Sequence, residues 1–186
     1  MHHAKPLLPW HGMTLLEYQV SCLLEGGMAE VVVVLGHRAT EVARYASGPG
    51  VRWVVNGRYR EGKASSIKAG ITEVSEGADA IALLAVDQPR TPEIVSQIVR
   101  AHLENAAIIT SPRYRGHGGH PLIFSAGLKL ELESISEETE GIREVFRRHS
   151  DKVTEVVIDD PMVRLDLNTP EDYEKARERY GGNPTD

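Results

Sequence analysis

Two aspartates associated with apolar segments are the strongest candidates for chemistry in this chain of 186 residues. Asp87 follows residues 80–86, an apolar run that suits a strand buried between two helix layers. Asp166 lies within a second short apolar segment, residues 163–167. Ligands in open α/β sheets bind beyond the carboxyl ends of the strands, and adjacent carboxylates suit Mg²⁺. A turn cap is the alternative role for Asp87, and sequence separation does not show that the two aspartates meet.

A polar loop, residues 56–66, leads from a predicted strand into the start of a predicted helix. It contains Asn56, three basic residues, and Ser65 and Ser66. The free N–H groups and partial positive charge of a helix N-terminus suit an anion or a polar base edge. The alternative is that Ser65 is a helix N-cap and that the basic residues are simply solvated.

His117 and His120 lie in a loop rich in Arg, Gly and His, residues 111–119 and just beyond. Their spacing suggests zinc, but Cys22 is the only cysteine, and no further ligand has suitable spacing in this loop. A flexible substrate-binding loop explains the composition better.

The elements that must position these groups alternate between helix and strand, which is typical of parallel α/β architecture. Runs of apolar residues predict strands, and apolar residues at helical spacing, with Thr and Pro at helix starts, predict helices. The expected strands are residues 30–35, 51–55, 80–86, 106–110, 121–124, 153–158 and 163–167. The expected helices are residues 14–25, 65–74, 92–104, 125–132, 141–149 and 170–180, with another starting at residues 40–45.

The composition predicts one globular domain, residues 1–180, followed by a flexible tail, residues 181–186. Hydrophobic residues make up 41% and charged residues 26% of the chain. No apolar run approaches the roughly 20 residues that span a bilayer, and no signal peptide is recognisable, so we expect a cytoplasmic protein with no membrane contact. The net charge of −6 argues against nucleic acid as a partner.

The first clear element is a helix, whereas a parallel α/β unit normally begins with a strand. We therefore expect an element that belongs upstream to be missing.

Five short motifs in register resemble those of the MobA-like nucleotidyltransferases, and most of all the molybdenum-cofactor cytidylyltransferases, over the whole chain. The motifs are Lys5 to Pro9; Asn56 through Glu61-Gly62 to Ser65-Ser66 and Gly70; Asp87-Gln88-Pro89; Gly119-His120-Pro121 with Phe124; and Asp166 to Asp172.

The resemblance implies a three-layer α/β/α Rossmann-like fold of the glycosyltransferase-A type, with a mostly parallel sheet. It also implies Mg²⁺-dependent transfer of CMP from CTP to the terminal phosphate of the molybdenum cofactor, with release of pyrophosphate. By resemblance, the catalytic residues are Lys5 and Asp87, and the metal ligands are Asp87 and Asp166. The implied nucleotide-binding residues are Lys5, Asn56, Ser65 and Ser66, and the implied acceptor-binding residues are Gly119, His120 and Pro121. Asn168 stands where many relatives have Asp.

The chain departs from the family pattern at its start. Relatives begin with a strand and a glycine-rich loop of the form Leu-Ala-Ala-Gly, whereas here Met1 falls on the methionine that ends this pattern and His2 replaces its glycine. We therefore expect a truncated sequence, lacking the first strand and most of the phosphate-binding loop, and a poor enzyme.

Other functions remain open on the sequence. They are guanylyl transfer, transfer to a sugar phosphate, and a truncated, non-catalytic cofactor-binding or chaperone-like role. Transient contact with a molybdoenzyme or its chaperone is the expected protein interaction.

Overall fold

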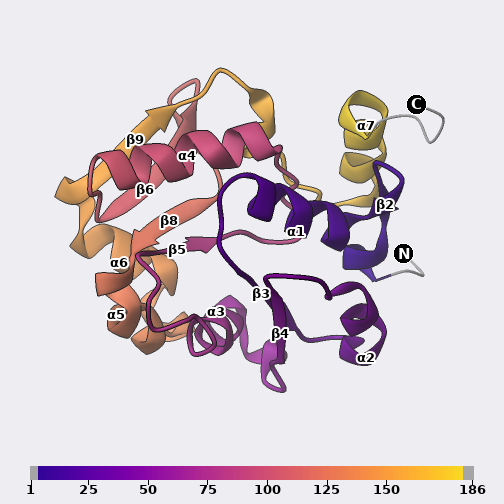
Figure 1. Ribbon diagram of the computed structural model, residues 1–186, viewed down its shortest axis with the longest axis horizontal. Helices are drawn as coiled ribbons and strands as arrows, with labels where there is room; N and C mark the ends of the chain where they lie inside the picture. Colours follow the sequence, from indigo (N-terminus) through magenta and orange to yellow (C-terminus); the bar gives the residue numbers. More distant parts are fainter. Residues whose placement is uncertain (1–3, 182–186) are drawn as a thin grey trace.

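The computed structural model describes residues 4–181, and its helices and strands alternate along the chain (Figure 1). The strands are β1 (Pro9–Trp10), β2 (Met13–Thr14), β3 (Val31–Leu35), β4 (Val51–Val55), β5 (Ala80–Leu83), β6 (Ile109–Tyr114), β7 (His117–Gly118), β8 (Leu122–Ser125) and β9 (Val153–Val157). The α-helices are α1 (Leu15–Glu25), α2 (Ala39–Val42), α3 (Lys63–Ile71), α4 (Pro92–Glu104), α5 (Lys129–Ser134), α6 (Ile142–Arg148) and α7 (Pro170–Tyr180). Short 3₁₀ segments are η1 (Lys5–Leu7), η2 (Ala43–Tyr45), η3 (Tyr59–Glu61), η4 (Ala126–Leu128), η5 (Glu137–Thr139), η6 (Ser150–Lys152) and η7 (Pro161–Arg164).

The larger sheet has five strands, and β6 lies at its centre. β6 pairs in parallel with β9 and antiparallel with β8 and β7, and β8 pairs antiparallel with β5. β8 is antiparallel to β6 because only a short connection through β7 joins them, and a parallel neighbour needs a longer crossover. A separate parallel pair, β3 and β4, forms a second sheet, and β1 and β2 form a small hairpin.

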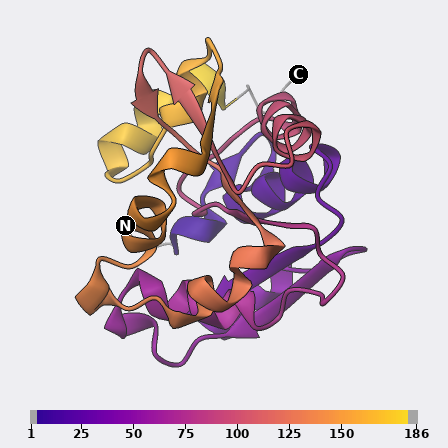
Figure 2. The same cartoon turned by 90° about the vertical axis from the view of Figure 1, so that its left-hand side faces the viewer.

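Helices cover both faces of the larger sheet, which gives the expected three-layer arrangement. Adjacent residues of a strand point to opposite faces, and in β8 Ile123 packs with Ile98 of α4 while Phe124 packs with Ile71 of α3. In the turned view of Figure 2, α4 and α3 accordingly lie on opposite sides of the strands. The fold is therefore a mixed α/β fold, as the sequence predicted.

Threonines begin three of the helices. The side chains of Thr14, Thr91 and Thr169 each accept a hydrogen bond from a backbone N–H in the first turn of the helix that follows. The N-cap predicted at Thr91 is confirmed. Glu17 and Asp172 complete capping boxes in α1 and α7, and these caps fix where each helix starts.

Two predicted strand ends were wrong, and one predicted strand is absent. β5 ends at Leu83, four positions before Asp87, because its ladder with β8 stops there. Residues 163–167 are not a strand: η7 ends at Arg164, and the side chain of Arg90 binds the Leu165 carbonyl in place of a neighbouring strand. β6 extends to Tyr114, into the segment expected to be a loop, because β7 and β9 both pair with it there.

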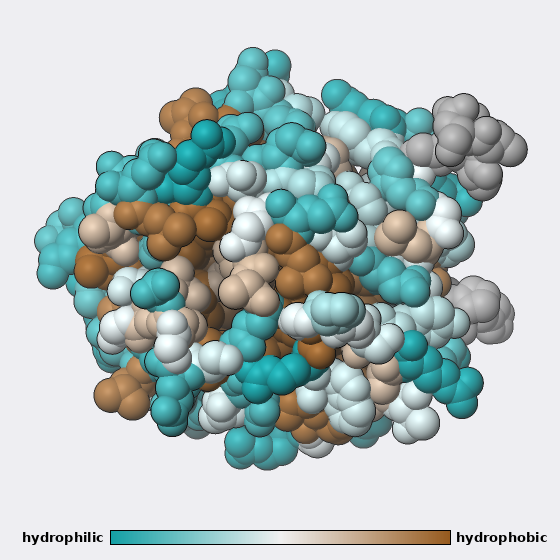
Figure 3. Space-filling view, viewed as in Figure 1, coloured by the Kyte–Doolittle hydropathy of each residue, from teal (hydrophilic) through white to brown (hydrophobic). Residues whose placement is uncertain are grey.

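The two sheets are not joined by a strand within residues 4–181. One edge of β3 and one edge of β5 thus lack a strand partner in this part of the chain. Figure 3 shows apolar side chains, in brown, gathered around a hollow between α4 and α3 on this face. The interruption therefore leaves apolar surface open on one face of the molecule.

At the C-terminal end, Gly181 is buried and its N–H donates to the carbonyl of Arg177 as the C-cap of α7. The remainder of the predicted tail, residues 182–186, lies outside the described residues, as do Met1 and His2, on which the comparison with the family's glycine-rich loop rests. Among the described helices, none is long and apolar enough to cross a membrane.

Candidate active site

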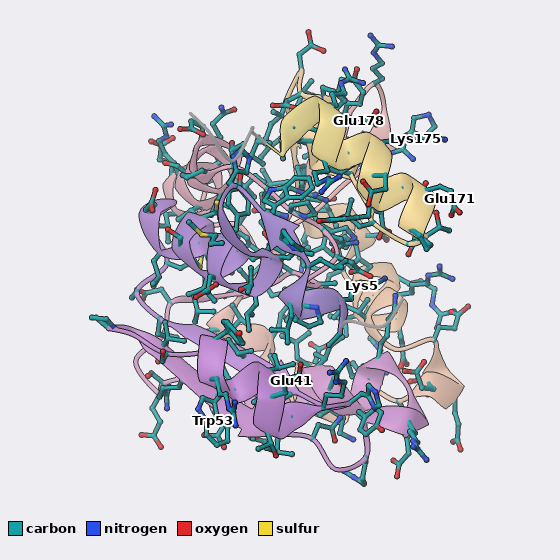
Figure 4. The ribbon with its side chains drawn as sticks, turned by 90° about the vertical axis from the view of Figure 1, so that its right-hand side faces the viewer. Lys5, Glu41, Trp53, Glu171, Lys175 and Glu178 are labelled. Carbon is teal, nitrogen blue, oxygen red and sulfur yellow. The ribbon has the colours of Figure 1, made fainter. Side chains whose placement is uncertain are left out.

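An ion pair between Lys5 and Asp87 joins η1 to the turn that follows β5. The Lys5 Nζ lies 2.9 Å from Asp87 Oδ2, and the two side chains are 31% and 23% exposed. Figure 4 shows Lys5 between α7, marked by Lys175 and Glu171, and the region of β4 marked by Trp53. The ion pair places a cation directly on the carboxylate that the sequence marked as a metal ligand.

The turn that carries Asp87 is held from α1. Within it, the N–H of Gln88 donates to the carbonyl of Ala85 at 3.0 Å. The buried amide of Gln19 donates to the carbonyls of Ala85 and Gln88, at 3.1 and 2.7 Å, and accepts from the N–H of Arg90 at 3.3 Å. Gln19 was missed in the sequence because a single glutamine on a helix gives no signal of a long-range contact.

Asp166 lies in the backbone segment beside Asp87. The N–H of Leu167, the residue after Asp166, donates to the carbonyl of Asp87 at 2.8 Å. Both aspartate side chains are partly buried. Because of this hydrogen bond, the backbone segments that carry the two aspartates are neighbours in the fold.

Two carboxylates from separate segments, partly open to solvent, can hold a divalent cation whose remaining ligands are water and phosphate. Among the described residues, no group of three or more His, Cys, Asp or Glu side chains could enclose a metal ion. His117 is exposed in β7, so the zinc alternative gains no support. The arrangement suits a metal that is shared with a substrate.

The segment Gly119 to Pro121 packs against η7, next to Asp166. The N–H of Gly119 donates to Pro112 at 2.9 Å, and the N–H of His120 donates to Val163 at 3.1 Å. A Cβ on Gly119 would lie 2.3 Å from both the carbonyl oxygen and Cγ1 of Val163. Only glycine allows this close approach, which brings His120 and the aspartates to one region.

The imidazole of His120 is held neutral by its surroundings. Burial lowers its pKa, and the positive charge of Arg90 lowers it further, while Asp166 acts in the opposite direction. The positive charge of Lys63, the first residue of α3, also lowers this pKa. His120 Nδ1 is buried and has no hydrogen-bond partner among the described residues.

Asn56, Ser65 and Ser66 form a second cluster. The amide nitrogen of Asn56 donates to Ser65 Oγ at 2.9 Å and to Ser66 Oγ at 3.1 Å, and its Oδ1 accepts from the N–H of Arg58 at 2.9 Å. Both protons of the Asn56 amide are therefore used within the protein. The second lone pair of its Oδ1 and the hydroxyl proton of Ser66 have no partner within residues 4–181 and can serve a ligand.

The start of α3 is capped by a residue from a distant segment. The N-cap position is Gly62, and Ser65 lies three residues later, so the alternative that Ser65 is the N-cap was wrong. The carboxylate of Glu137 accepts from the N–H of Ala64 at 2.7 Å. It thereby supplies the negative charge that a helix N-terminus favours.

Comparisons with known proteins agree with this geometry. Residues 1–153 match the model of the MobA-like NTP transferase domain. The chain is 32% identical to nicotine blue oxidoreductase of Paenarthrobacter nicotinovorans, with 90% of this chain and 84% of the relative covered. It is 25% identical to the molybdenum cofactor cytidylyltransferase of Escherichia coli K12, with 95% and 88% covered.

A solved structure has the same fold over nearly the whole chain. The crystal structure of Rv0371c from Mycobacterium tuberculosis superposes with a TM-score of 0.82 and 27% identity, covering 96% of this chain and 90% of that one. The same protein has also been solved in complex with manganese. Because the family model matches most of the chain, the chain belongs to the MobA-like NTP transferase domain family and is a nucleotidyltransferase.

Proposed function

We propose that the protein transfers CMP from CTP to the terminal phosphate of the molybdenum cofactor. An oxygen of the acceptor phosphate attacks the α-phosphorus of CTP, the bond from that phosphorus to the β-phosphate oxygen breaks, and pyrophosphate leaves. The observation that carries the proposal is the adjacency of Asp87 and Asp166 beside Lys5. Phosphoryl-group chemistry of this kind depends on positioning and charge neutralisation, which these groups can supply.

Mg²⁺ is the proposed metal, and the residues present fit it. Asp87 and Asp166 would hold it, since both are partly open carboxylates and Asp87 already binds a cation, the ammonium of Lys5, at 2.9 Å. When bound, the metal would neutralise charge on the triphosphate. The manganese complex of Rv0371c supports use of a divalent metal in a protein of similar fold.

Lys5 has two proposed roles in this site. In the absence of metal it neutralises Asp87, at 2.9 Å. When a metal binds Asp87, the flexible ammonium can turn to the phosphates of the nucleotide instead, because its stem is long and its three protons rotate freely. Lys5 and Asp87 are therefore the proposed catalytic pair.

The nucleotide and the acceptor are assigned to the two sides of this pair. We assign Asn56, Ser65 and Ser66 to the nucleotide side, where Asn56 keeps an acceptor oxygen and Ser66 a donor proton. We assign Gly119, His120 and Pro121 to the acceptor side. A neutral imidazole at His120, whose buried Nδ1 has no partner in the described part of the chain, avoids adding charge and can hydrogen-bond a polar acceptor.

The specific choice of CTP and molybdenum cofactor rests on the likeness to the cytidylyltransferase at 25% identity. The relative at 32% identity is named an oxidoreductase, so the percentage of identical residues does not by itself identify the reaction. The pair of aspartates favours nucleotidyl transfer.

The test is to incubate the protein with Mg²⁺, reduced molybdenum cofactor and each of the four NTPs, and to measure both pyrophosphate and the dinucleotide product. We expect CTP to be consumed, with one pyrophosphate for each dinucleotide formed. Asp87→Asn should lower the rate by about 100-fold or more, the range seen when electrostatic stabilisation of a transition state is removed. Asp151→Asn, an exposed aspartate in η6, is the matched control and should retain the rate. Full activity of Asp87→Asn, or no product with any NTP, contradicts the proposal.

A further inference from the structure

Arg90 is an arginine whose side chain is completely buried, at 0% exposure. It follows Asp87-Gln88-Pro89 directly and precedes α4. Burial of a guanidinium is costly unless its N–H groups are hydrogen-bonded, so a buried arginine must have specific partners. None of the ion pairs within residues 4–181 includes Arg90, and its partners are found elsewhere.

The guanidinium donates to three backbone carbonyls from three segments of the chain. Nε donates to His120 O at 2.8 Å, and Nη1 donates to Pro89 O at 2.7 Å and to Leu165 O at 2.9 Å. Pro89 belongs to the turn of Asp87, and Leu165 directly precedes Asp166. One side chain thus ties together the two segments that carry the aspartates and the segment that carries His120.

The charge of Arg90 is compatible with its burial. Burial lowers the pKa of its guanidinium to about 10, against the opposing charges of Asp166 and Asp160, so the group stays protonated at neutral pH. Carbonyl oxygens accept from the N–H groups, and nearby carboxylates balance the charge without a direct ion pair. The three hydrogen bonds use the Nε proton and both Nη1 protons of the guanidinium.

We propose that Arg90 is a positioning residue for nucleotidyl transfer, which sets the separation of Asp87 and Asp166 and their position relative to the acceptor segment Gly119 to Pro121. The inference rests on the proposed function of these residues. Arg90 acts through the three carbonyls and does not contact the substrates. Gln19 has the narrower task of holding the turn of Asp87 alone, through Ala85 and Gln88.

Lysine cannot replace arginine in this role. The guanidinium is planar and directs Nε and Nη1 along different fixed directions, whereas a lysine has one nitrogen at the end of a flexible stem. Arg90→Lys keeps the positive charge but loses the fixed link between His120 and Leu165. This variant therefore separates positioning from charge.

The experiment measures Mn²⁺ binding by electron paramagnetic resonance, and the kinetics of pyrophosphate release, for wild type, Arg90→Lys and Arg90→Gln. Arg100→Lys, an exposed arginine on α4, is the matched control. We expect both Arg90 variants to bind Mn²⁺ about 10-fold to 100-fold more weakly, as is typical when a residue that orients metal ligands is changed. In Arg90→Lys, kcat should fall about 100-fold, while KM for the NTP stays within about threefold of wild type.

Wild-type Mn²⁺ affinity and wild-type kcat in a folded Arg90→Lys variant would overturn the proposal. Loss of cooperative thermal unfolding in both Arg90 variants would also overturn it, because Arg90 would then serve folding and not the site. Mn²⁺ binding needs no turnover, so the role of Arg90 is tested even if CTP and the molybdenum cofactor are not substrates. In that case only the proposed function fails.

Discussion

The ammonium of Lys5 and the carboxylate of Asp87, the proposed metal ligand, form an ion pair at 2.9 Å. The ammonium and the metal therefore compete for one carboxylate. Lys5 keeps Asp87 neutralised when no metal is bound, and metal binding must displace it. This competition gives opposite expectations for metal affinity and for catalysis.

Replacing Lys5 by methionine removes the competing cation and keeps a side chain of similar length. We expect Lys5→Met to bind Mn²⁺ about twofold to fivefold more tightly, the affinity equivalent of a partly exposed ion pair. The rate of transfer should nevertheless fall about 100-fold, because a positive group beside the phosphates is lost. Titration with Mn²⁺ and pyrophosphate release measure the two effects. Lys175→Met on α7 is the control, and weaker Mn²⁺ binding by Lys5→Met would contradict the competition.

Gly119 allows the acceptor segment to lie against η7. In Gly119→Ala the new Cβ would meet the backbone and Cγ1 of Val163 at 2.3 Å, so the segment must move. We expect a loss of about 1–3 kcal/mol in unfolding free energy, as in other overpacked sites, and a higher KM for the acceptor. Thermal unfolding and steady-state kinetics check this. Gly57→Ala is the matched control, since nothing lies within 4 Å of its Cβ position, and equal effects of the two changes would exclude the steric cause.

The open edge of β3 should be visible in hydrogen exchange. The N–H of Val31 and the carbonyl of Leu35 bond toward β4, so by alternation Val32 and Val34 direct their N–H groups to the other edge, where no partner is found among residues 4–181. We expect the amides of Val32 and Val34 to exchange at least about tenfold faster than that of Val33. Amide exchange followed by NMR distinguishes these positions. Equal protection of all three amides would mean that both edges of β3 are paired.

His102 makes stability depend on pH. It is 4% exposed, its Nδ1 lies 2.8 Å from Thr110 Oγ1, and burial lowers its pKa below the ordinary value. As the pH falls through about 6.5, the unfolded chain takes up a proton that the folded state does not, so the unfolding free energy decreases. Above that pH the contribution is fully present.

The measurement is urea unfolding between pH 7.5 and pH 5.5, for wild type and for His102→Gln. His120, whose pKa is also lowered, contributes with the same sign. The unfolding free energy of wild type should decrease over this range, and the decrease should be smaller in His102→Gln. An equal decrease in the two proteins would show that His102 does not cause the pH dependence.

Much of the fold follows from local patterns. Apolar runs predicted strands β3, β4 and β9, and an amphipathic pattern predicted helix α4. These predictions succeeded because the side chains that one strand or helix buries lie close together in the sequence. Thr91 and Thr169 marked helix starts because a hydroxyl acceptor is useful at a free helix N-terminus. The end of β5 at Leu83 was not predictable, because a strand ends where its neighbour's ladder ends, and that neighbour, β8, lies far along the chain.

By itself, the sequence determined the chemical types at the site: carboxylates at Asp87 and Asp166, a cation at Lys5 and a polar loop around Asn56. The tertiary structure decided which of these groups meet. The hydrogen bond from the N–H of Leu167 to Asp87 places the segment of Asp166 beside that of Asp87. Gln19, on α1, holds the turn that carries Asp87, and Arg90, just before α4, holds the segment that carries Asp166. Those contacts join residues more than 60 positions apart, and no local pattern records such pairs. Side-chain chemistry is local, whereas distance between side chains is a property of the whole packed chain.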